Sequence, residues 1–334
     1  MNPMESIFAF IAALSNAWLV VVLLAGLALV IFGADFLVDG ASSLARRSGI
    51  SEFVIGLTIV GFGTSCPELV VSVTGALAGN SDIAIGNVLG SNIFNTLLIL
   101  GMTALVMPIA ITRANLRRDI PLTLGVTVLM IACGMSYTLF KLGTGDGLSR
   151  VEGLVFLIIF ALYIWSCFNF DDKSADSTDE QKTFSVAGSI GLILAGLAGL
   201  VVGGKVFVEA ATDLASNLGV SDKFIAITVL AGGTSLPELA TCVIAAAKKK
   251  GQLALGNILG SNVFNILLIL GCAAVIHPVS FADINLVDMG TLLGSAVLVL
   301  LSAFFFKRNQ VDRGDGALLL LGFIAYYVWL FMNL

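Results

Sequence analysis

The chain has 334 residues, of which 58% are hydrophobic and 12% are charged, and its formal net charge is −5 at pH 7. Soluble globular domains contain about 25% charged residues, so this composition excludes an ordinary soluble domain and indicates several membrane spans. The sequence offers no basic patch for nucleic acid. The single histidine, His277, argues against an imidazole metal site and a Ser-His-Asp triad, and the five cysteines form no CxxC pair.

Long, continuous apolar runs predict membrane-spanning helices, because a β-barrel would show short segments of alternating hydrophobicity. A hydrocarbon core about 30 Å thick requires a helix of roughly 20 residues. The sequence therefore predicts an all-α integral membrane fold with ten transmembrane helices. In chain order they are expected at Ala17–Val38, Phe53–Ala78, Ile83–Pro108, Pro121–Phe140, Val151–Phe168, Phe184–Val208, Phe224–Ala247, Leu253–His277, Leu286–Phe306 and Gly316–Met332.

Basic residues gather after the odd-numbered spans, which places 13 of the 17 lysines and arginines on one side of the membrane. The positive-inside rule assigns this side to the cytoplasm, so both termini are expected outside. No basic segment precedes the first apolar run, which argues against a cleaved signal peptide. The small size and the lack of a targeting segment favour a prokaryotic plasma membrane, that is, a bacterial inner membrane.

One stretch of the chain occurs twice. Residues 56–101 and 226–271 align without a gap at an offset of 170, and 23 of the 46 aligned positions are identical. The match extends to Gly33–Ser51 and Gly203–Ser221, so each half holds five predicted spans. Because five is odd, the second half enters the membrane in the opposite orientation. We expect two inverted repeats, residues 1–169 and 185–334, a pattern typical of secondary transporters with a midplane site.

Residues 170–184 join the two halves and are expected in the cytoplasm. The segment Asp171–Gln181 (DDKSADSTDEQ) is acidic and polar. A regulatory cation sensor is one interpretation, but the acids do not follow the spacing of a calcium-binding loop. A solvated linker is the favoured interpretation.

Glu68 and Glu238 occupy matched positions near the middle of spans 2 and 7. An ionised carboxylate at this depth costs about 2.5 kcal/mol or more, and intramembrane acids are functional by default. A capping box is the structural alternative, since Ser65-x-x-Glu68 and Ser235-x-x-Glu238 fit its spacing. Glutamine would cap equally well, so we favour a functional role for both carboxylates.

A proline precedes each glutamate and is expected to break its helix. Proline cannot donate to the carbonyl four residues back, so Pro67 and Pro237 leave backbone oxygens free. Such a break is tolerated at membrane depth only where it lines a cavity or packs against protein. The carbonyls and carboxylates form a predicted all-oxygen site for hard cations, together with the hydroxyls of Thr64, Ser65, Thr234 and Ser235. Cys66 is interpreted as a packing residue, because its counterpart is Leu236.

Spans 3 and 8 supply a second predicted wall. Polar residues recur along one helix face at Asn87, Ser91 and Asn95, and again at Asn257, Ser261 and Asn265. Ligand roles are expected, because of their depth, for Ser91, Ser261, Asn95 and Asn265. Interhelical hydrogen bonding is the alternative, and it is favoured for Asn87, Asn92, Asn257 and Asn262. The pairs Gly86-xxx-Gly90 and Gly256-xxx-Gly260 indicate close helix packing.

Both copies contain G-T-S-x-P-E followed by G-N-x-x-G-S-N-x-F-N. These motifs resemble the alpha repeats of the cation/calcium exchanger superfamily, and most closely its prokaryotic sodium/calcium exchanger branch. The resemblance covers both motif copies, and the ten-span inverted architecture covers nearly the whole chain. It implies a secondary active transporter, not an enzyme, that exchanges Na⁺ for Ca²⁺ by alternating access.

The resemblance also implies four cation positions. The central Ca²⁺ position would use the carboxylates of Glu68 and Glu238 and the carbonyls of Thr64 and Thr234. One Na⁺ position would use Ala231, Thr234, Ser235, Ser261 and Glu68, and its mirror would use Gly61, Thr64, Ser65, Ser91 and Glu238. The remaining position would be flanked by Asn95 and Asn265.

In the resembled family, spans 1 and 6 are long and tilted and slide across the remaining bundle. The small residues of Gly33–Ala41 and Gly203–Ala211 suit that motion. Some members, including those similar to potassium-dependent exchangers, have an acid at the position of Asn265. Asparagine there and at Asn95 argues against K⁺ co-transport. Proton-coupled members have a different motif around the glutamate, so Na⁺ coupling is favoured.

Charge balance limits the substrate, because two carboxylates are neutralised by one Ca²⁺ or by two Na⁺. A proton/calcium antiporter is the main alternative, since water-accessible glutamates can bind protons. A cation channel is favoured less, because inverted repeats are typical of carriers. A membrane enzyme with the glutamates as acid and base is favoured least, because no nucleophile or cofactor motif is present. The expected partners are Ca²⁺, Na⁺ and the lipid bilayer, with no cofactor, nucleic acid or obligate protein partner.

Overall fold

The computed structural model describes residues 15–141, 145–172, 183–220, 231–282, 284–306 and 309–333. Within these ranges, seven helices are long and apolar enough to cross a membrane, and a bent pair, Glu52–Thr64 with Cys66–Leu77, adds an eighth span. The predicted all-α membrane fold is confirmed. The number of ten spans stays a prediction, because span 7 begins in residues 221–230, outside the described ranges, and span 4 is interrupted at Met135.

The helices follow one another with short connections, and some contain π-helical turns, labelled η. The first half contains α2 (Asn16–Ser48), α3 (Glu52–Ile55), η1 (Gly56–Val60), α4 (Gly61–Thr64), α5 (Cys66–Leu77), α6 (Ser81–Ile93), η2 (Phe94–Ile99), α7 (Leu100–Val106), η3 (Asn115–Asp119), α8 (Ile120–Gly134), α9 (Ser136–Phe140) and α10 (Arg150–Asn169). The second half contains α11 (Val186–Asn217), α13 (Ala231–Thr234), α14 (Leu236–Ala247), α15 (Gly251–Val263), η5 (Phe264–Ile269), α16 (Leu270–Ile276), α17 (Leu286–Leu301), η6 (Ser302–Phe306) and α18 (Arg313–Met332).

The sequence repeat is reproduced in the backbone. Five consecutive elements, α4 to α7, have the same boundaries as α13 to α16 after a shift of 170 residues, and η2 corresponds to η5 in the same way. The helix breaks and the π-helical turns η2 and η5 recur at matched residues, whereas η3 and η6 have no π-helical counterpart at this offset. The two halves are therefore copies of one structural unit over this region.

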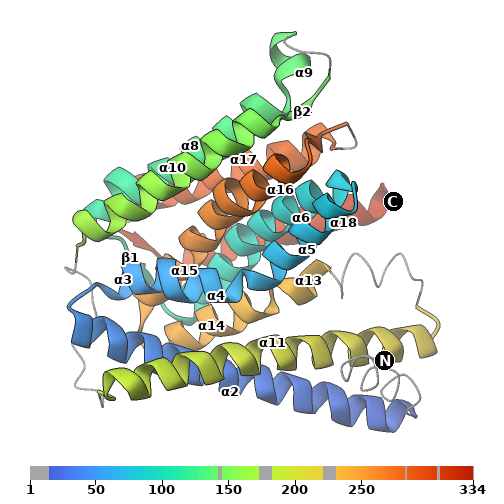
Figure 1. The fold of residues 1–334 in the computed structure, drawn as a ribbon. Helices are drawn as coiled ribbons and strands as arrows, with labels where there is room; N and C mark the ends of the chain where they lie inside the picture. The colour runs from blue at the N-terminus through green and yellow to red at the C-terminus, as the bar shows by residue number, and fades with distance from the viewer. Residues whose placement is uncertain are drawn as a thin grey trace.

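Two short strand pairs show how the copies are oriented. Strand β1 (Ile109–Ala110) pairs antiparallel with β4 (Gln310–Val311), and β2 (Gly147–Leu148) pairs with β3 (Val279–Ser280). The matched strands β1 and β3 differ by the same offset of 170 residues, yet the two pairs lie at opposite ends of the molecule (Figure 1). This arrangement is expected for inverted repeats.

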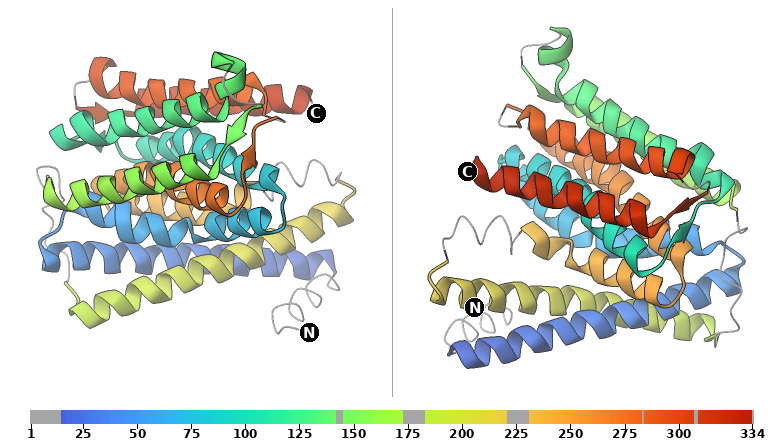
Figure 2. Two further views of the ribbon diagram at one scale, coloured as in Figure 1. Left: turned by 45° about the horizontal axis from the view of Figure 1, so that its top comes forward. Right: turned by 180° about the vertical axis from the view of Figure 1, so that it is seen from behind.

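Helices α2 and α11 lie side by side along one face of the bundle (Figures 1 and 2). They contain 33 and 32 residues. The predicted ends of spans 1 and 6, at Val38 and Val208, are wrong, because polar residues beyond these points stay within the helix. Arg46 and Arg47, expected to follow span 1, lie in the last turn of α2, where basic side chains interact favourably with the helix dipole. The other described spans begin and end within a few residues of their predicted positions.

Glycines bring α2 and α11 into backbone contact. A Cβ atom on Gly26 would lie 2.8 Å from Phe207 N, and one on Gly33 would lie 2.8 Å from Gly196 O. One on Gly40 would lie 2.7 Å from Ser189 O. Gly33 and Gly40, which belong to the stretch of small residues predicted to suit sliding, contact α11 here, and the sliding motion stays a prediction. They join α2 to α11 in a glycine seam, which makes the two helices a close-packed pair.

The Gly256-xxx-Gly260 motif packs closely against a neighbouring helix, as predicted. A Cβ atom on Gly256 would lie 2.1 Å from Phe53 O, and one on Gly260 would lie 2.7 Å from Leu57 O, so α15 packs directly on α3 and η1. For the mirror motif, Gly86 and Gly90, the equivalent partner would be residues 223–227, which lie outside the described residues. That half of the packing prediction remains open.

Substitution of Gly33 by alanine is expected to loosen the α2–α11 pair, because the new methyl group would collide with backbone atoms of α11. The expected cost is about 1–3 kcal/mol, as for other overpacked sites. Thermal unfolding in detergent would show a lower melting temperature. Gly191→Ala is the matched control on α11, where no described atom lies within 4 Å of the added Cβ. Equal melting temperatures for the two variants would contradict a tight seam.

Candidate cation-binding site

The helix that carries Glu68 is interrupted at Ser65, where φ is −85° and ψ is 5°. The equivalent Ser235 has φ −89° and ψ 5°. Each proline then falls in the first turn of the second half-helix, where its missing N–H costs little. The segments Glu52–Thr64 and Cys66–Leu77 meet at 49°. The predicted break of span 2 is confirmed, and the same backbone geometry is present in the described part of span 7.

Both glutamates lie in the first turn of a half-helix and are buried, with Glu68 1% exposed and Glu238 2% exposed. A helix N-terminus carries a partial positive charge, which favours a carboxylate there. Within the described ranges, no lysine or arginine forms an ion pair with either glutamate. Their Oε2 atoms also have no hydrogen-bond partner among the described residues. The site therefore has two acids whose charge the described protein does not neutralise.

The serines next to the breaks bond across the two halves. Ser65 Oγ lies 3.0 Å from Glu238 Oε1, and Ser235 Oγ donates to Glu68 Oε1 at 3.4 Å. The capping-box alternative is wrong, because neither serine side chain bonds to the backbone of its own half-helix. The hydroxyls point to the carboxylate of the opposite repeat instead. Each half thus completes the polar surroundings of the other half's acid.

Helix α15 joins this cluster. Ser261 Oγ lies 3.0 Å from Ser65 Oγ, and Thr64 Oγ1 donates to Asn257 Oδ1 at 3.1 Å. Ser91, the counterpart of Ser261 on α6, is also buried. For Gly61 and Ala231 the predicted ligands are backbone carbonyls, and these residues begin the short helices α4 and α13, one turn before the breaks.

Three of the four asparagines assigned to packing, Asn87, Asn257 and Asn262, make interhelical hydrogen bonds. Asn87 donates to Glu68 O at 3.1 Å and to Ser72 Oγ at 3.0 Å. Asn257 donates to Cys242 Sγ at 3.1 Å. Ser72 and Cys242 are matched by the 170-residue offset but differ in identity, so a search for identical polar pairs passes over them. These contacts hold the second wall against the half-helices. For Asn92, both amide atoms lack a partner among the described residues.

Asn95 and Asn265 lie in the π-helical turns η2 and η5 and are both 1% exposed. The N–H of Leu100 donates to Asn95 O five residues back, which widens the turn. Helix η2 contacts α14 and η5 contacts α5, so each asparagine lies on a segment packed against a glutamate-bearing half-helix. Their Oδ1 atoms have no partner in the described part of the chain. π-Helical turns often mark functional sites.

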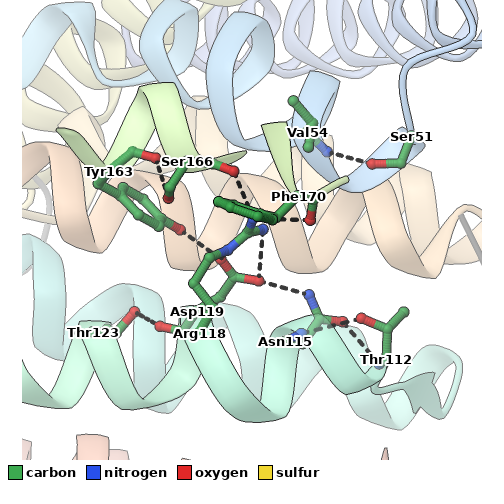
Figure 3. A network of polar contacts seen from close by, with 10 residues as sticks. All are labelled: Ser51, Val54, Thr112, Asn115, Arg118, Asp119, Thr123, Tyr163, Ser166 and Phe170. Atoms are coloured by element: carbon green, nitrogen blue, oxygen red, sulfur yellow. Dashed lines mark hydrogen bonds and ion pairs between the residues drawn. The ribbon is translucent and has the colours of Figure 1, made fainter. Parts of the chain in front are cut away.

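Another buried acid shows what a structural carboxylate looks like in this protein. Asp119, at the end of η3, is fully buried and lies 2.8 Å from Arg118 Nε (Figure 3). Tyr163 and Asn115 also donate to it, and Arg118 donates to the carbonyl oxygens of Ser166 and Phe170 at the end of α10. Asp119 is satisfied by protein groups. Glu68 and Glu238 differ from it in having no basic partner among the described residues.

The donor set decides which ion suits the site. The atoms around the two glutamates are carboxylate, hydroxyl, amide and carbonyl oxygens. No cluster of three or more His, Cys, Asp or Glu side chains occurs within the residues that the structure describes. Oxygen donors suit hard cations such as Ca²⁺ and Na⁺, whereas thiolate and imidazole suit softer metals.

A cavity of about 570 Å³ reaches this region from between α11 and the two half-helices. Its lining includes Thr234 and Pro237 beside the break of span 7, and Lys205 and Glu209 on α11. Cys66, interpreted from sequence as a packing residue, also lines the cavity. The cavity therefore borders both half-helices next to the residues that precede the glutamates, Pro67 and Pro237.

Comparisons with known proteins agree with this geometry. The sodium/calcium exchanger protein family matches residues 18–169 and 188–332. Inner membrane protein YrbG of Escherichia coli is 38% identical over 328 residues, covering 93% of this chain and 95% of YrbG. Sodium/calcium exchanger MaX1 of Methanosarcina acetivorans is 34% identical over 343 residues, covering 93% of this chain and 97% of MaX1. A solved structure of the sodium-calcium exchanger NCX_Mj is 32% identical, with a TM-score of 0.80, covering 93% of this chain and 98% of that chain.

These similarities extend over both repeats and nearly the whole chain, so they concern the complete transporter architecture and not a single motif. The names of MaX1 and NCX_Mj state an activity, and both are exchangers, which move ions and catalyse no covalent chemistry. The chain belongs to the sodium/calcium exchanger protein family and is a transmembrane antiporter, not an enzyme.

Proposed function

We propose that this protein exchanges Na⁺ for Ca²⁺ by alternating access at a site centred on Glu68 and Glu238. The observation that supports this most is the pair of buried carboxylates with no basic partner among the described residues. A buried charge without compensation is costly, so a closed site requires cations. MaX1 and NCX_Mj are both described as sodium/calcium exchangers, which favours this ion pair.

The proposed Ca²⁺ position uses the carboxylates of Glu68 and Glu238 and the carbonyls of Thr64 and Thr234. The proposed Na⁺ positions add Gly61, Ser65 and Ser91 from one half and Ala231, Ser235 and Ser261 from the other. The crossed bonds from Ser65 to Glu238 and from Ser235 to Glu68 support this assignment. Asn95 and Asn265 line the remaining position through their amide oxygens, which have no hydrogen-bond partner among the described residues.

Competition for the same two carboxylates explains coupling in this proposal. One Ca²⁺ balances two negative charges, and two Na⁺ do the same, but the ligands cannot serve both sets together. An occupied site is neutral and can close, whereas an empty site retains two buried charges. Exchange follows, because the transporter changes orientation only when one set of ions has replaced the other.

The orientation belongs to the proposal as well. Residues 1–169 and 185–334 form the two inverted repeats, and residues 170–184 form a cytoplasmic linker. The start of α2 and the end of α18 lie at the same end of the molecule, which fits termini on one side (Figures 1 and 2). The positive-inside rule places them outside a prokaryotic plasma membrane.

Ca²⁺ uptake into sealed proteoliposomes tests the exchange directly. Vesicles loaded with Na⁺ and diluted into Na⁺-free buffer are expected to accumulate Ca²⁺, because outward Na⁺ movement drives the inward step. Vesicles with equal Na⁺ on both sides serve as the control. Uptake driven only by a pH gradient would favour a proton/calcium antiporter, and flux that follows the Ca²⁺ gradient alone would indicate a channel.

Glu68→Gln and Glu238→Gln are each expected to reduce exchange to background, because the amide keeps the shape but removes a charged ligand. The variants should remain folded, as shown by size-exclusion chromatography. Glu152→Gln is the matched control, since this partly buried glutamate closes a capping box on α10 that glutamine also forms. Normal exchange in either site variant would eliminate the proposed site.

Asn265→Asp is expected to change the cation preference, because it adds a negative charge beside the two glutamates. The measurement is the dependence of Ca²⁺ uptake on Na⁺ and K⁺ concentration. Asn95→Asp, at the mirror position, provides the comparison. Unchanged Na⁺, K⁺ and Ca²⁺ dependence in both variants would argue against a role for these asparagines in ion binding.

A further inference from the structure

Lys248, at the end of α14, forms ion pairs with two acids on α2. Its Nζ atom lies 2.7 Å from Asp35 Oδ1 and 2.6 Å from Asp39 Oδ1. It also donates to the backbone oxygen of Asp35 at 3.3 Å. The two acids are four residues apart and therefore share one face of α2. This triad connects the α2–α11 pair to the half-helix that begins beside Glu238.

The triad is unusual because its acids belong to an apolar membrane helix. Ionisable side chains within such helices are costly, pair with one another and usually mark functional positions. None of the three side chains is a proposed ion ligand. Their contacts instead determine how closely the end of α14 is held to α2.

The inverted repeat shows that the exact mirror of this triad is not present at the opposite end. After the shift of 170 residues, Asp35 and Asp39 correspond to Lys205 and Glu209, and Ala78 corresponds to Lys248. A mirror triad is impossible, because alanine cannot form an ion pair. Lys205 and Glu209 instead line the 570 Å³ cavity between α11 and the half-helices. The pair is tied to α14 at the Lys248 end, and at the Lys205 end it borders a cavity whose lining includes charged and polar side chains. A second cavity, of about 1100 Å³ and lined mostly by apolar side chains, lies between α10 and the other half of α11.

The glycine seam relates these two observations. Because α2 and α11 touch through their backbones, a shift of one carries the other. Holding α2 against α14 at the Lys248 end therefore keeps α11 away from the half-helices at the Lys205 end.

We propose that Lys248, Asp35 and Asp39 form a latch that favours the state open at the Lys205 end. Its release is required before the site opens at the Lys248 end, which is the side rich in lysine and arginine. These residues are positioning residues for the transport cycle, and the inference rests on the alternating access proposed above. The asymmetry comes from two differences between matched positions, lysine against alanine at 248 and 78 and aspartate against lysine at 35 and 205.

Two matched cysteine reporters test the latch without measuring transport. Cys66 lines the cavity at the Lys205 end and also the apolar cavity beside α10, which disfavours a charged reagent. Its counterpart Leu236 can be replaced by cysteine to report the Lys248 end. The Leu236→Cys protein in detergent, free of Na⁺ and Ca²⁺, is treated with a charged methanethiosulfonate reagent. Mass spectrometry of the peptides measures modification at each cysteine separately, so that Cys133, Cys167, Cys242 and Cys272 do not interfere.

Lys248→Gln is expected to accelerate modification at position 236 about fivefold, equal to about 1 kcal/mol at 25 °C. Modification of Cys66 should become slower. It should stay unchanged if most molecules of the variant are still open at the Lys205 end. Lys249→Gln is the control, because it removes the neighbouring positive charge and leaves the triad intact. Lys248→Arg should keep the original rates, and the exchange Lys248→Asp with Asp39→Lys should restore them.

The outcomes separate a latch from a merely structural contact. Acceleration at position 236 alone, with rescue by the charge exchange, supports the latch even if the transported ions differ from those proposed. Equal acceleration at both cysteines would show general loosening and overturn the latch, as would unchanged rates at both. Should Lys248→Gln fail to fold, Asp39→Asn applies the same test from the other helix.

Discussion

Two carboxylates buried at the centre of a membrane protein impose the main constraint on this structure. Glu68 and Glu238 are shielded from solvent, and no described lysine or arginine pairs with them. Asp119 shows that the same chain can neutralise a buried acid with an adjacent arginine and two further donors. The glutamates have no such partners among the described residues, so their charge is left for cations to neutralise. The broken helices, the serine hydroxyls and the asparagine oxygens all contribute polar groups to this one location.

Inversion of the repeat explains why the site needs both halves. Pro67 and Pro237, each two residues after a serine, fix a break at the same point in spans 2 and 7. Each half-helix then has its glutamate in its first turn. Because the copies face opposite ends of the molecule, Ser65 meets Glu238 and Ser235 meets Glu68. A site shared in this way changes whenever the halves move relative to each other, which suits a transporter that exposes its ions to alternate sides.

Departures from the repeat are as informative as the repeat itself. The half-helices, the π-helical turns η2 and η5 and the second wall are matched closely, so the polar groups around the glutamates are nearly symmetric. The α2–α11 pair departs from this symmetry, because Lys248 has Ala78 as its counterpart and Asp35 has Lys205. In the proposed exchange, symmetry at the site would let both orientations bind the same ions. Asymmetry away from the site would then set the balance between the orientations without altering the ligands.

The sequence alone determined the membrane class, the repeat, the broken helices and the two central glutamates, because hydropathy and proline chemistry act locally. It also indicated which serines and asparagines belong to the polar motif. It could not determine their partners: the crossed serine–glutamate bonds join residues 173 and 167 positions apart and depend on how the halves are docked. The ends of α2 and α11 were misjudged because charged residues beyond Val38 looked like loop, whereas Asp39 is paired with Lys248 from another helix. The glycines of α2 indicated from sequence that something packs closely, but only the tertiary structure shows that the neighbour is α11.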